Sequence, residues 1–414
     1  MSRAPTILLI GTADTKSAEL LFMRECIEAG GGRVVVMDVG VLDGAPFTPD
    51  IPNTEVAAAA GKTVAEVAAS GDENSAMTLM ARGAARLAAR WQAEGRIDGL
   101  LALGGTMGTD LALDVAQALP LGVPKVLVST IAYSHLLPPE RIPPDLIMVL
   151  WAGGLYGLNS LCRSALSQAA GAVLGACRQA CVPAFKKPLV GMTSLGSSAL
   201  TYMKTLKPAL EARGYEVAVF HTTGMGGRAF EALAAEGRFC AVMDFSLQEL
   251  ANQLGGSCVT AGPDRLLGAG RAGTPQIVAP GAIDMLDYPA WQSTPEGLEG
   301  RPTHIHNRLL ASALSAPAFR RGVAAEIARR LARAEGATCL LMPLQGIEGW
   351  DRPGEPLHDP EGLAAFTEAL RGSVDPARLV ELDAHINDSA FCDAALRVFD
   401  AWVADGTVPA GSHA

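Results

Sequence analysis

The fold of this chain is decided by the stretch TILLIGTADTKSAELLFMRECIEAGGGRVVVMDVG, residues 6–40. A short apolar run leads through a small polar turn into an amphipathic helix, glycines stop that helix, and a second β-run follows. The same order of elements returns in LVGMTSLGSSALTYMKTLKPALEARGYEVAVFHTTG, residues 189–224. LGVPKVLVSTIA (121–132) likewise has a counterpart in AGTPQIVAPGAID (272–284). The sequence therefore predicts two similar domains that are related by internal duplication.

The alternation of strands and helices predicts the fold class. It is α/β, with two Rossmann-like doubly wound domains and mainly parallel sheets. The 414 residues are too many for one ordinary core. We expect a first domain over 1–182 and a second over 188–406, joined by the linker VPAFKKP (182–188). Strands are expected in the first domain at 6–10, 33–39, 97–103, 124–129 and 146–151, and in the second at 189–193, 215–221, 239–244, 276–279, 338–342 and 378–382.

Composition excludes several classes of protein. A formal charge of −10 argues against a general nucleic-acid binder, which needs a basic face. The apolar stretch 146–162 is interrupted by glycines and followed by Arg163, so we expect no membrane span. The eight cysteines are scattered, which predicts buried or inert thiols, and the N-terminus does not resemble a signal sequence. These features predict a cytoplasmic protein.

Glycine- and threonine-rich loops follow three strands of the first domain. They are Gly11–Lys16 after the first strand, Gly104–Thr109 after the third and Ser129–Thr130 after the fourth. Ends of parallel strands meet at one edge of a sheet, where backbone N–H groups and helix N-termini bind phosphate. We predict that a nucleotide is bound there by Gly11, Thr12, Asp14, Thr15, Lys16, Gly104, Gly105, Thr106, Gly108, Thr109, Ser129 and Thr130.

The alternative for each loop is a tight turn that needs no ligand, with Thr109 acting as a helix cap. The first loop is not a P-loop, because Thr15 and not glycine precedes Lys16. The loop 104–109 does not match GxGxxG, so a dinucleotide cofactor is disfavoured. Lys16 would neutralise phosphate charge, although a lysine in a first helical turn is commonly only solvated.

Histidines mark the second domain, which holds five of the seven. We predict that His221, His306 and His385 are proton carriers or metal ligands, and that Asn307 and Asp388 orient them. Asp244, Asp284 and Asp287 are further candidate orienting carboxylates. The alternative for any single histidine is a strand-end side chain bonded to backbone. A Ser-His-Asp hydrolase with Ser194, Ser197 or Ser198 is disfavoured, since the sequence has no G-x-S-x-G elbow.

A set of motifs, in order along residues 7–403, resembles a known family. They are GTADTK (11–16), LGGTMGT (103–109), LPLGVPKVLVSTIA (119–132), GLN (157–159), VFHTTGMGGRAFEAL (219–233), AGPDRL (261–266), PGAIDM (280–285), IHN (305–307) and HIND (385–388). The chain is similar to the two-domain ATP-binding proteins related to the plant protein that inhibits tomato mosaic virus replication.

The resemblance implies ATP bound by the first domain and a homodimer. It also makes a TIM-barrel protein a candidate partner, because some relatives are fused to such a domain. Mg²⁺ or another divalent metal is an open expectation alongside ATP. The leading hypothesis is an enzyme that binds ATP or a related phosphorylated ligand and acts on a small acidic metabolite near the second-domain histidines. The other hypothesis is a nucleotide-sensing module that acts through protein contacts.

Overall fold

The computed structural model describes residues 3–42, 44–181, 183–196 and 199–413. Two compact units divide between Ala184 and Phe185, inside the segment predicted as a linker. Val182, at the predicted end of the first domain, and Ser197 and Ser198, two of the serines considered for a hydrolase, lie outside the described residues.

The first unit is built on a five-stranded sheet in the order β2-β1-β3-β4-β5, with every neighbouring pair parallel. Its strands are β1 (Thr6–Gly11), β2 (Arg33–Asp38), β3 (Gly99–Gly104), β4 (Lys125–Ser129) and β5 (Leu146–Leu150). Both β1 and β3 are buried along their whole length, as expected of central parallel strands with helices on both faces.

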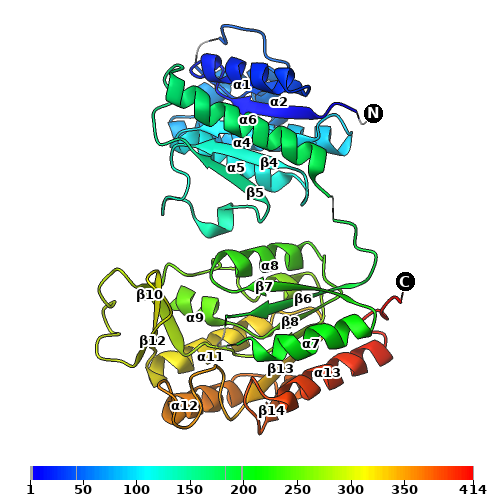
Figure 1. The fold of residues 1–414 in the computed structure, drawn as a ribbon, viewed down its shortest axis with the longest axis vertical. Coiled ribbons are helices and arrows are strands. Elements are labelled where there is room, and N and C mark those ends of the chain that lie inside the picture. The colour runs from blue at the N-terminus through cyan, green and yellow to red at the C-terminus, as the bar shows by residue number, and fades with distance from the viewer. Residues whose placement is uncertain (1–2, 43, 182, 197–198, 414) are drawn as a thin grey trace. The chain divides into compact units, whose positions relative to one another are not determined.

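Helices cover both faces of this sheet (Figure 1). The helices are α1 (Ser17–Ala29), α2 (Asn53–Ala59), α3 (Val64–Ala68), α4 (Glu73–Ala93), α5 (Thr106–Ala118), α6 (Ser160–Gln179) and the short 3₁₀ helix η1 (Pro139–Arg141). α1 packs against α6, whereas α4 packs against α2 and α5. Each pairing closes its own apolar core, one around Leu20 and Leu166 and the other around Met80 and Leu111.

The second unit has a six-stranded parallel sheet in the order β14-β13-β9-β8-β6-β7. Its strands are β6 (Leu189–Ser194), β7 (Glu216–His221), β8 (Ala241–Asp244), β9 (Gln276–Val278), β13 (Thr338–Pro343) and β14 (Leu379–Leu382). A small antiparallel sheet, which the sequence did not predict, joins β10 (Met285–Pro289), β12 (Leu310–Leu314) and β11 (Thr303–Ile305).

Helices again lie on both faces of the large sheet of the second unit. α7 packs against α13 on one face, and α11 packs against α12 and α9 on the other. The helices are α7 (Thr201–Ala212), α8 (Met225–Ala235), α9 (Gln248–Leu254), α10 (Gly268–Arg271), α11 (Pro317–Leu331), α12 (Pro360–Arg371), α13 (Ser389–Ala404) and the 3₁₀ helix η2 (Pro376–Arg378).

The two large sheets share one strand order. The strands of the first sheet lie in the order 2-1-3-4-5. In the second unit, the parallel strands can be renumbered along the chain from β6 as strand 1, leaving out the antiparallel strands. Their order in the sheet is then 2-1-3-4-5-6. This is one of the two common doubly wound orders, with the order reversing between the first and third strands. The predicted fold class, two α/β domains with mostly parallel sheets, is confirmed. A shared strand order is what an internal duplication would leave, and the duplication stays a prediction.

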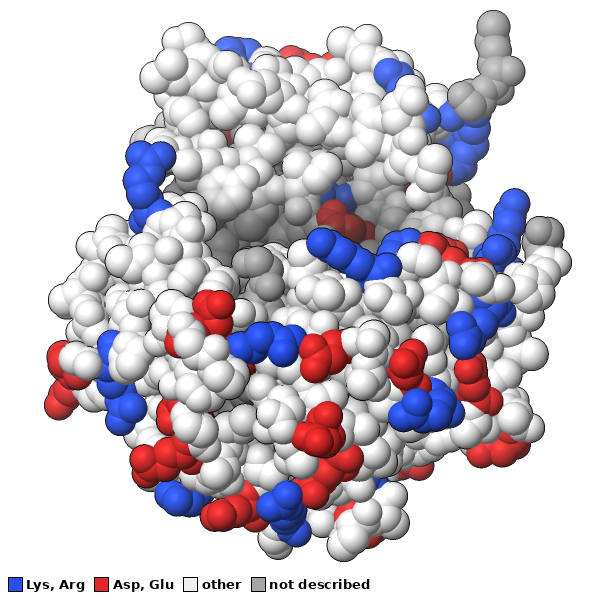
Figure 2. Space-filling model, turned by 60° about the horizontal axis from the view of Figure 1, so that its bottom comes forward, with Lys and Arg blue, Asp and Glu red and all other residues white. Residues whose placement is uncertain are grey.

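On the charged part of the face shown in Figure 2, Lys/Arg and Asp/Glu side chains lie side by side, and much of the remaining surface carries neither. Ion pairs of the second unit, such as Arg213 with Asp400 and Arg329 with Glu326, mix the signs in the same way. All eight cysteines belong to the described part of the chain and are free thiols; Cys181 and Cys258 are exposed rather than buried. Every helix in the described ranges is too short or too polar to cross a lipid bilayer.

Candidate functional site

A cavity of about 480 Å³ opens at the carboxyl edge of the first sheet. It lies between the loop that follows β1 and the loop that follows β3, where the strand order reverses. Ligands of doubly wound proteins bind at this switch point, and the volume falls in the range of small-molecule pockets.

Nine of the twelve predicted nucleotide-binding residues line this cavity. They are Gly11, Thr12, Asp14, Thr15, Lys16, Gly104, Gly105, Thr106 and Gly108. The loops also start two helices, α1 at Lys16 and α5 at Gly105, and in the described part of the chain neither N-terminus receives a side-chain cap. The first N–H groups of both helices therefore lack side-chain acceptors beside the cavity.

The two adjacent glycines of the second loop serve different purposes. A Cβ on Gly104 would lie 2.5 Å from backbone atoms of Gly108, so the tight turn itself requires glycine there. A Cβ on Gly105 would meet only Thr130 Oγ1, at 3.8 Å, and its φ of −72° suits any residue. The protein has room for a side chain at Gly105, and that space adjoins the cavity.

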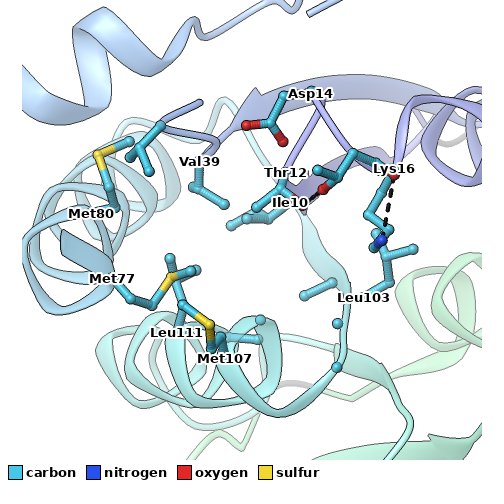
Figure 3. Close-up of a pocket in the computed structure, with 18 of the residues that line it drawn as sticks. Ile10, Thr12, Asp14, Lys16, Val39, Met77, Met80, Leu103, Met107 and Leu111 are labelled. Carbon is cyan, nitrogen blue, oxygen red and sulfur yellow. Dashed lines mark hydrogen bonds between the residues drawn. The ribbon is translucent and has the colours of Figure 1, made fainter. Parts of the chain in front are cut away.

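An apolar wall faces the loops. Figure 3 shows Met77 and Met80 of α4 across the pocket from Lys16, and Leu111 of α5 near them. Val39, after β2, completes this wall. The wall was not predicted from the sequence, because an amphipathic helix at 75–94 indicates a buried face but not whether that face contacts the sheet or a ligand.

Thr109, Ser129 and Thr130, the other three predicted residues, do not line the cavity. Thr109 and Ser129 are fully buried and share a hydrogen bond of 2.7 Å between their hydroxyl oxygens. Thr130 N–H donates to the carbonyl of Gly104. These contacts connect the end of β4 to the loop after β3. The three residues therefore hold that loop in position without lining the cavity.

Two aspartates hold the loops in place. Asp38, at the end of β2, accepts hydrogen bonds from the backbone N–H groups of Ala13 and Gly40. Asp14 Oδ2 accepts the N–H of Leu42, while Asp14 Oδ1 is buried without a hydrogen-bond partner among the described residues. Asp14 lines the cavity and so offers it an unused acceptor.

Among the described residues, the three predicted catalytic histidines make no direct contact with one another. His221 is exposed at the end of β7, and its Nδ1 accepts the N–H of Gly196. His385 follows β14, at the opposite edge of the same sheet. His306, after β11, packs beside His304 and Trp350, and its Nε2 contacts Ser312 Oγ at 3.0 Å.

The predicted orienting residues contact backbone rather than imidazole. Asn307 Oδ1 accepts the N–H groups of Leu309 and Leu310 in the turn before β12. Asp388 accepts the backbone N–H of His385 and forms an ion pair with Arg352 at 2.6 Å.

His385 instead belongs to a buried acidic cluster. Its Nε2 lies 2.8 Å from Asp351 Oδ1, and its Nδ1 accepts the N–H of Asn387, so Nε2 carries the proton. Asp351, Asp284 and Glu348 bring carboxylate oxygens within 4.8 Å of one another. Burial, and then the charge of Asp284, raise the pKa of Glu348 to about 9. Burial likewise raises the pKa of Asp284 to about 6.

Asp284 was predicted only as an orienting carboxylate, and Glu348 and Asp351 were not predicted from the sequence. Their loop, QGIEGWD (345–351), directly follows a strand that was predicted correctly. Acidic residues in a loop at the carboxyl end of a parallel strand could have indicated a site there. Gly346, at φ +131°, has no space for a Cβ, which would lie 2.4 Å from Asp351 Oδ1 and 2.5 Å from the ring of His385. A cavity of about 110 Å³ adjoins the cluster and is lined by Asp284, Asp351 and Arg320.

The glycine-rich turn before α8 resembles the turn before α5 but is occupied by the protein itself. Glu249 Oε1 accepts the N–H groups of Gly224 and Gly227 at 2.6 and 3.1 Å. Arg265, fully buried, pairs with Glu249, Glu231 and Asp244. Asp244, another candidate orienting carboxylate, is thereby part of this ion-pair network.

The fold and the cavity define a two-domain α/β protein with a ligand-sized pocket at the switch point of its first sheet. The chain belongs to the protein family UPF0261, described as uncharacterised. The model of that family's N-terminal domain matches residues 5–181, and the model of its C-terminal domain matches residues 187–403.

Similar proteins span bacteria and a plant. A UPF0261 protein of Brucella melitensis is 57% identical over 100% of this chain and 99% of its own length, and one of Clostridium tetani is 35% identical over 93% and 96%. The ToMV susceptible protein tm-1(GCR26) of Solanum lycopersicum is 27% identical over 96% of this chain and 56% of its own. The resemblance stated from the motifs is confirmed.

Proposed function

We propose that the first unit binds ATP or a closely related phosphorylated ligand in its 480 Å³ cavity. The observation that carries this proposal is the pairing of two chemistries in one pocket. Apolar side chains form one wall, and glycine loops with two helix N-termini that lack side-chain caps in the described part of the chain form the other. An adenine ring suits the first wall and a phosphate chain suits the second.

Individual residues take roles within this proposal. Backbone N–H groups of residues 105–108 and the N-terminus of α1 would bind phosphate oxygens. Lys16 would add a positive charge; the ion pairs among the described residues do not include it. Asp14 Oδ1, buried without a partner among those residues, would accept a ribose hydroxyl.

The positions of the histidines concern the hypothesis that the second unit acts on a small acidic metabolite. His221 ends β7 and His385 follows β14, the two edge strands of the sheet, and their rings are not in contact among the described residues. The proposal therefore includes no direct proton transfer between these two histidines. Nucleotide binding with turnover and nucleotide sensing without turnover remain the two proposals for the whole protein. Homodimer formation and a TIM-barrel partner are further proposals carried by the family resemblance.

Isothermal titration of the full chain with ATP and Mg²⁺ tests the binding proposal. We expect saturable binding of ATP to the unmodified protein. Gly105→Val should weaken it by about a hundredfold, ~2.7 kcal/mol, because the new side chain enters the cavity next to the phosphate site. Gly154→Val is the matched control, since Gly154 is exposed in the same unit with nothing near its Cβ position.

Two results would contradict the proposal. One is equal ATP affinity in Gly105→Val and Gly154→Val with both variants folded. The other is the absence of any saturable nucleotide binding to the unmodified protein. Given binding, release of phosphate or conversion of an added metabolite would separate an enzyme from a sensing module.

A further inference from the structure

Three carboxylates gather inside the second unit beside its small cavity. Asp284 follows β9, and Glu348 and Asp351 lie in the loop after β13, so two neighbouring strands deliver them to one edge of the sheet. Their ligand oxygens all lie within 4.8 Å of one another. Exposed fractions are 2% for Asp284, 0% for Glu348 and 7% for Asp351. Such close buried acids need a compensating charge or protons.

Two of the three carboxylates keep an oxygen without a donor. Glu348 Oε2 accepts the N–H of Trp350 at 2.8 Å, but its Oε1 has no hydrogen-bond partner among the described residues. The same holds for Asp284 Oδ1 within those ranges. A buried acceptor left unpaired costs about 1–3 kcal/mol. Both oxygens therefore indicate an additional ligand at this place.

The arginine and histidine side chains beside the cluster, Arg320 and His385, are already engaged. Arg320, 1% exposed, pairs with Asp359 at 2.7 Å and donates to the carbonyl of Ser315. Both ring nitrogens of His385 are engaged as well, because Nδ1 accepts the N–H of Asn387 and Nε2 contacts Asp351. Among the described residues, neither side chain donates a hydrogen bond to Glu348 Oε1 or Asp284 Oδ1.

We propose that Asp284, Glu348 and Asp351 bind one divalent cation, Mg²⁺ or Mn²⁺, inside the second unit. Carboxylate oxygens are the ligands that these hard cations prefer. The adjoining cavity of about 110 Å³ has room for water molecules that complete the coordination. His385 is a positioning residue: its Nε2–H orients Asp351, as outer-shell hydrogen bonds orient metal ligands. The proposal rests on residues of the second unit alone and does not depend on nucleotide binding by the first.

Mn²⁺ titration of the full chain tests the proposal directly. The protein is stripped with a chelator, kept free of nucleotide, and titrated while electron paramagnetic resonance measures unbound Mn²⁺. We expect one saturable Mn²⁺ per chain, displaced by Mg²⁺. Glu348→Gln and Asp284→Asn should each weaken it more than about tenfold, and His385→Gln should weaken it by about tenfold through Asp351.

Asp287→Asn is the matched control. Asp287 is a buried carboxylate of the same unit, bonded to Gln248 and Asn252 rather than to the three acids, so Mn²⁺ affinity should not change. Far-UV circular dichroism and melting without metal check that each variant folds. Equal Mn²⁺ affinity in folded Glu348→Gln and in the unmodified protein overturns the proposal. Absence of saturable binding to the unmodified protein overturns it as well.

If Glu348→Gln and Asp284→Asn both fail to fold, crystals of the unmodified protein soaked in Mn²⁺ test the proposal instead. Anomalous density between the three carboxylates supports the site. Density elsewhere only, or none, overturns it.

Discussion

The two glycine-rich turns of this protein look alike in sequence and differ in what occupies them. In the first unit, residues 104–109 lead into α5, whose N-terminus borders an open cavity. In the second, residues 222–227 lead into α8, where Glu249 accepts the N–H groups of Gly224 and Gly227. Glycines thus predict available backbone donors, but they do not tell whether the anion comes from solvent or from the protein itself.

The charged side chains around the two turns also differ. Arg265 holds Glu249 in place and also binds Glu231 and Asp244, with all four side chains at most 3% exposed. At the cavity of the first unit the cation is Lys16, which is only partly buried. The second turn is therefore closed by an internal ion-pair network, while the first is left for a ligand.

The largest effect is expected from breaking the closed turn. Arg265→Met leaves three buried carboxylates without their cation and should lower the free energy of unfolding by about 3–5 kcal/mol. Arg213→Met, which removes an exposed ion pair with Asp400, should cost less than about 1 kcal/mol. Urea unfolding measures both. Similar losses in the two variants would show that the network does not hold the turn.

A smaller effect should follow from removing the cation of the open turn. Lys16→Gln should weaken ATP binding about five- to tenfold, ~1–1.4 kcal/mol, with little effect on adenosine. Lys62→Gln is the control, because Lys62 is an exposed lysine of the same unit beside Glu66. Calorimetry with ATP and adenosine tests this prediction. An equal loss for both ligands would place Lys16 away from the phosphates.

A substitution in the apolar wall of the cavity should weaken ATP binding less than the loss of Lys16. Met77→Gln keeps the length of the side chain and the helix propensity but makes this half-buried wall polar. We expect about threefold weaker ATP binding, ~0.6 kcal/mol, and unchanged binding of inorganic triphosphate. Thr78→Gln, at the exposed neighbouring position, is the control. Loss of triphosphate binding in Met77→Gln would mean that the wall does not contact the base.

The last comparison concerns pH and the histidines of the second unit, and its effect on stability is close to zero at neutral pH. Burial, with a further contribution from His304, lowers the pKa of His306 to about 4. The unfolded chain therefore binds a proton at this position below about pH 6.5 while the folded chain does not. As pH falls from 6.5 to 4, the unmodified protein should lose stability relative to His306→Gln, and above 6.5 the difference should be constant. Urea unfolding of both proteins at pH 7 and pH 5 measures the difference, and an equal difference at the two pH values would contradict this prediction.

The strands and their polar ends were predictable because buried parallel strands are short apolar runs bounded by glycine and polar residues. β1, β3 and β6 each begin and end within two residues of the prediction, and nine loop residues line the cavity. Local chemistry determines these features, since an apolar run and the turn after it are adjacent in the chain.

Features that depend on strand order could not be predicted. His221 and His385 both follow strands, but β7 and β14 are opposite edges of the sheet, and sequence order does not reveal this. Glu348 and Asp351 meet Asp284 only because β13 pairs with β9. No short motif marks an acidic cluster assembled from two separate loops.

Amide hydrogen exchange with and without saturating ATP tests the contrast between the two turns most directly. We predict slower exchange over residues 11–17 and 104–109, where amides would bind phosphate, and no change over 222–228, where Glu249 already occupies them. Protection confined to 222–228, or no protection of either turn while ATP is bound, would contradict the account.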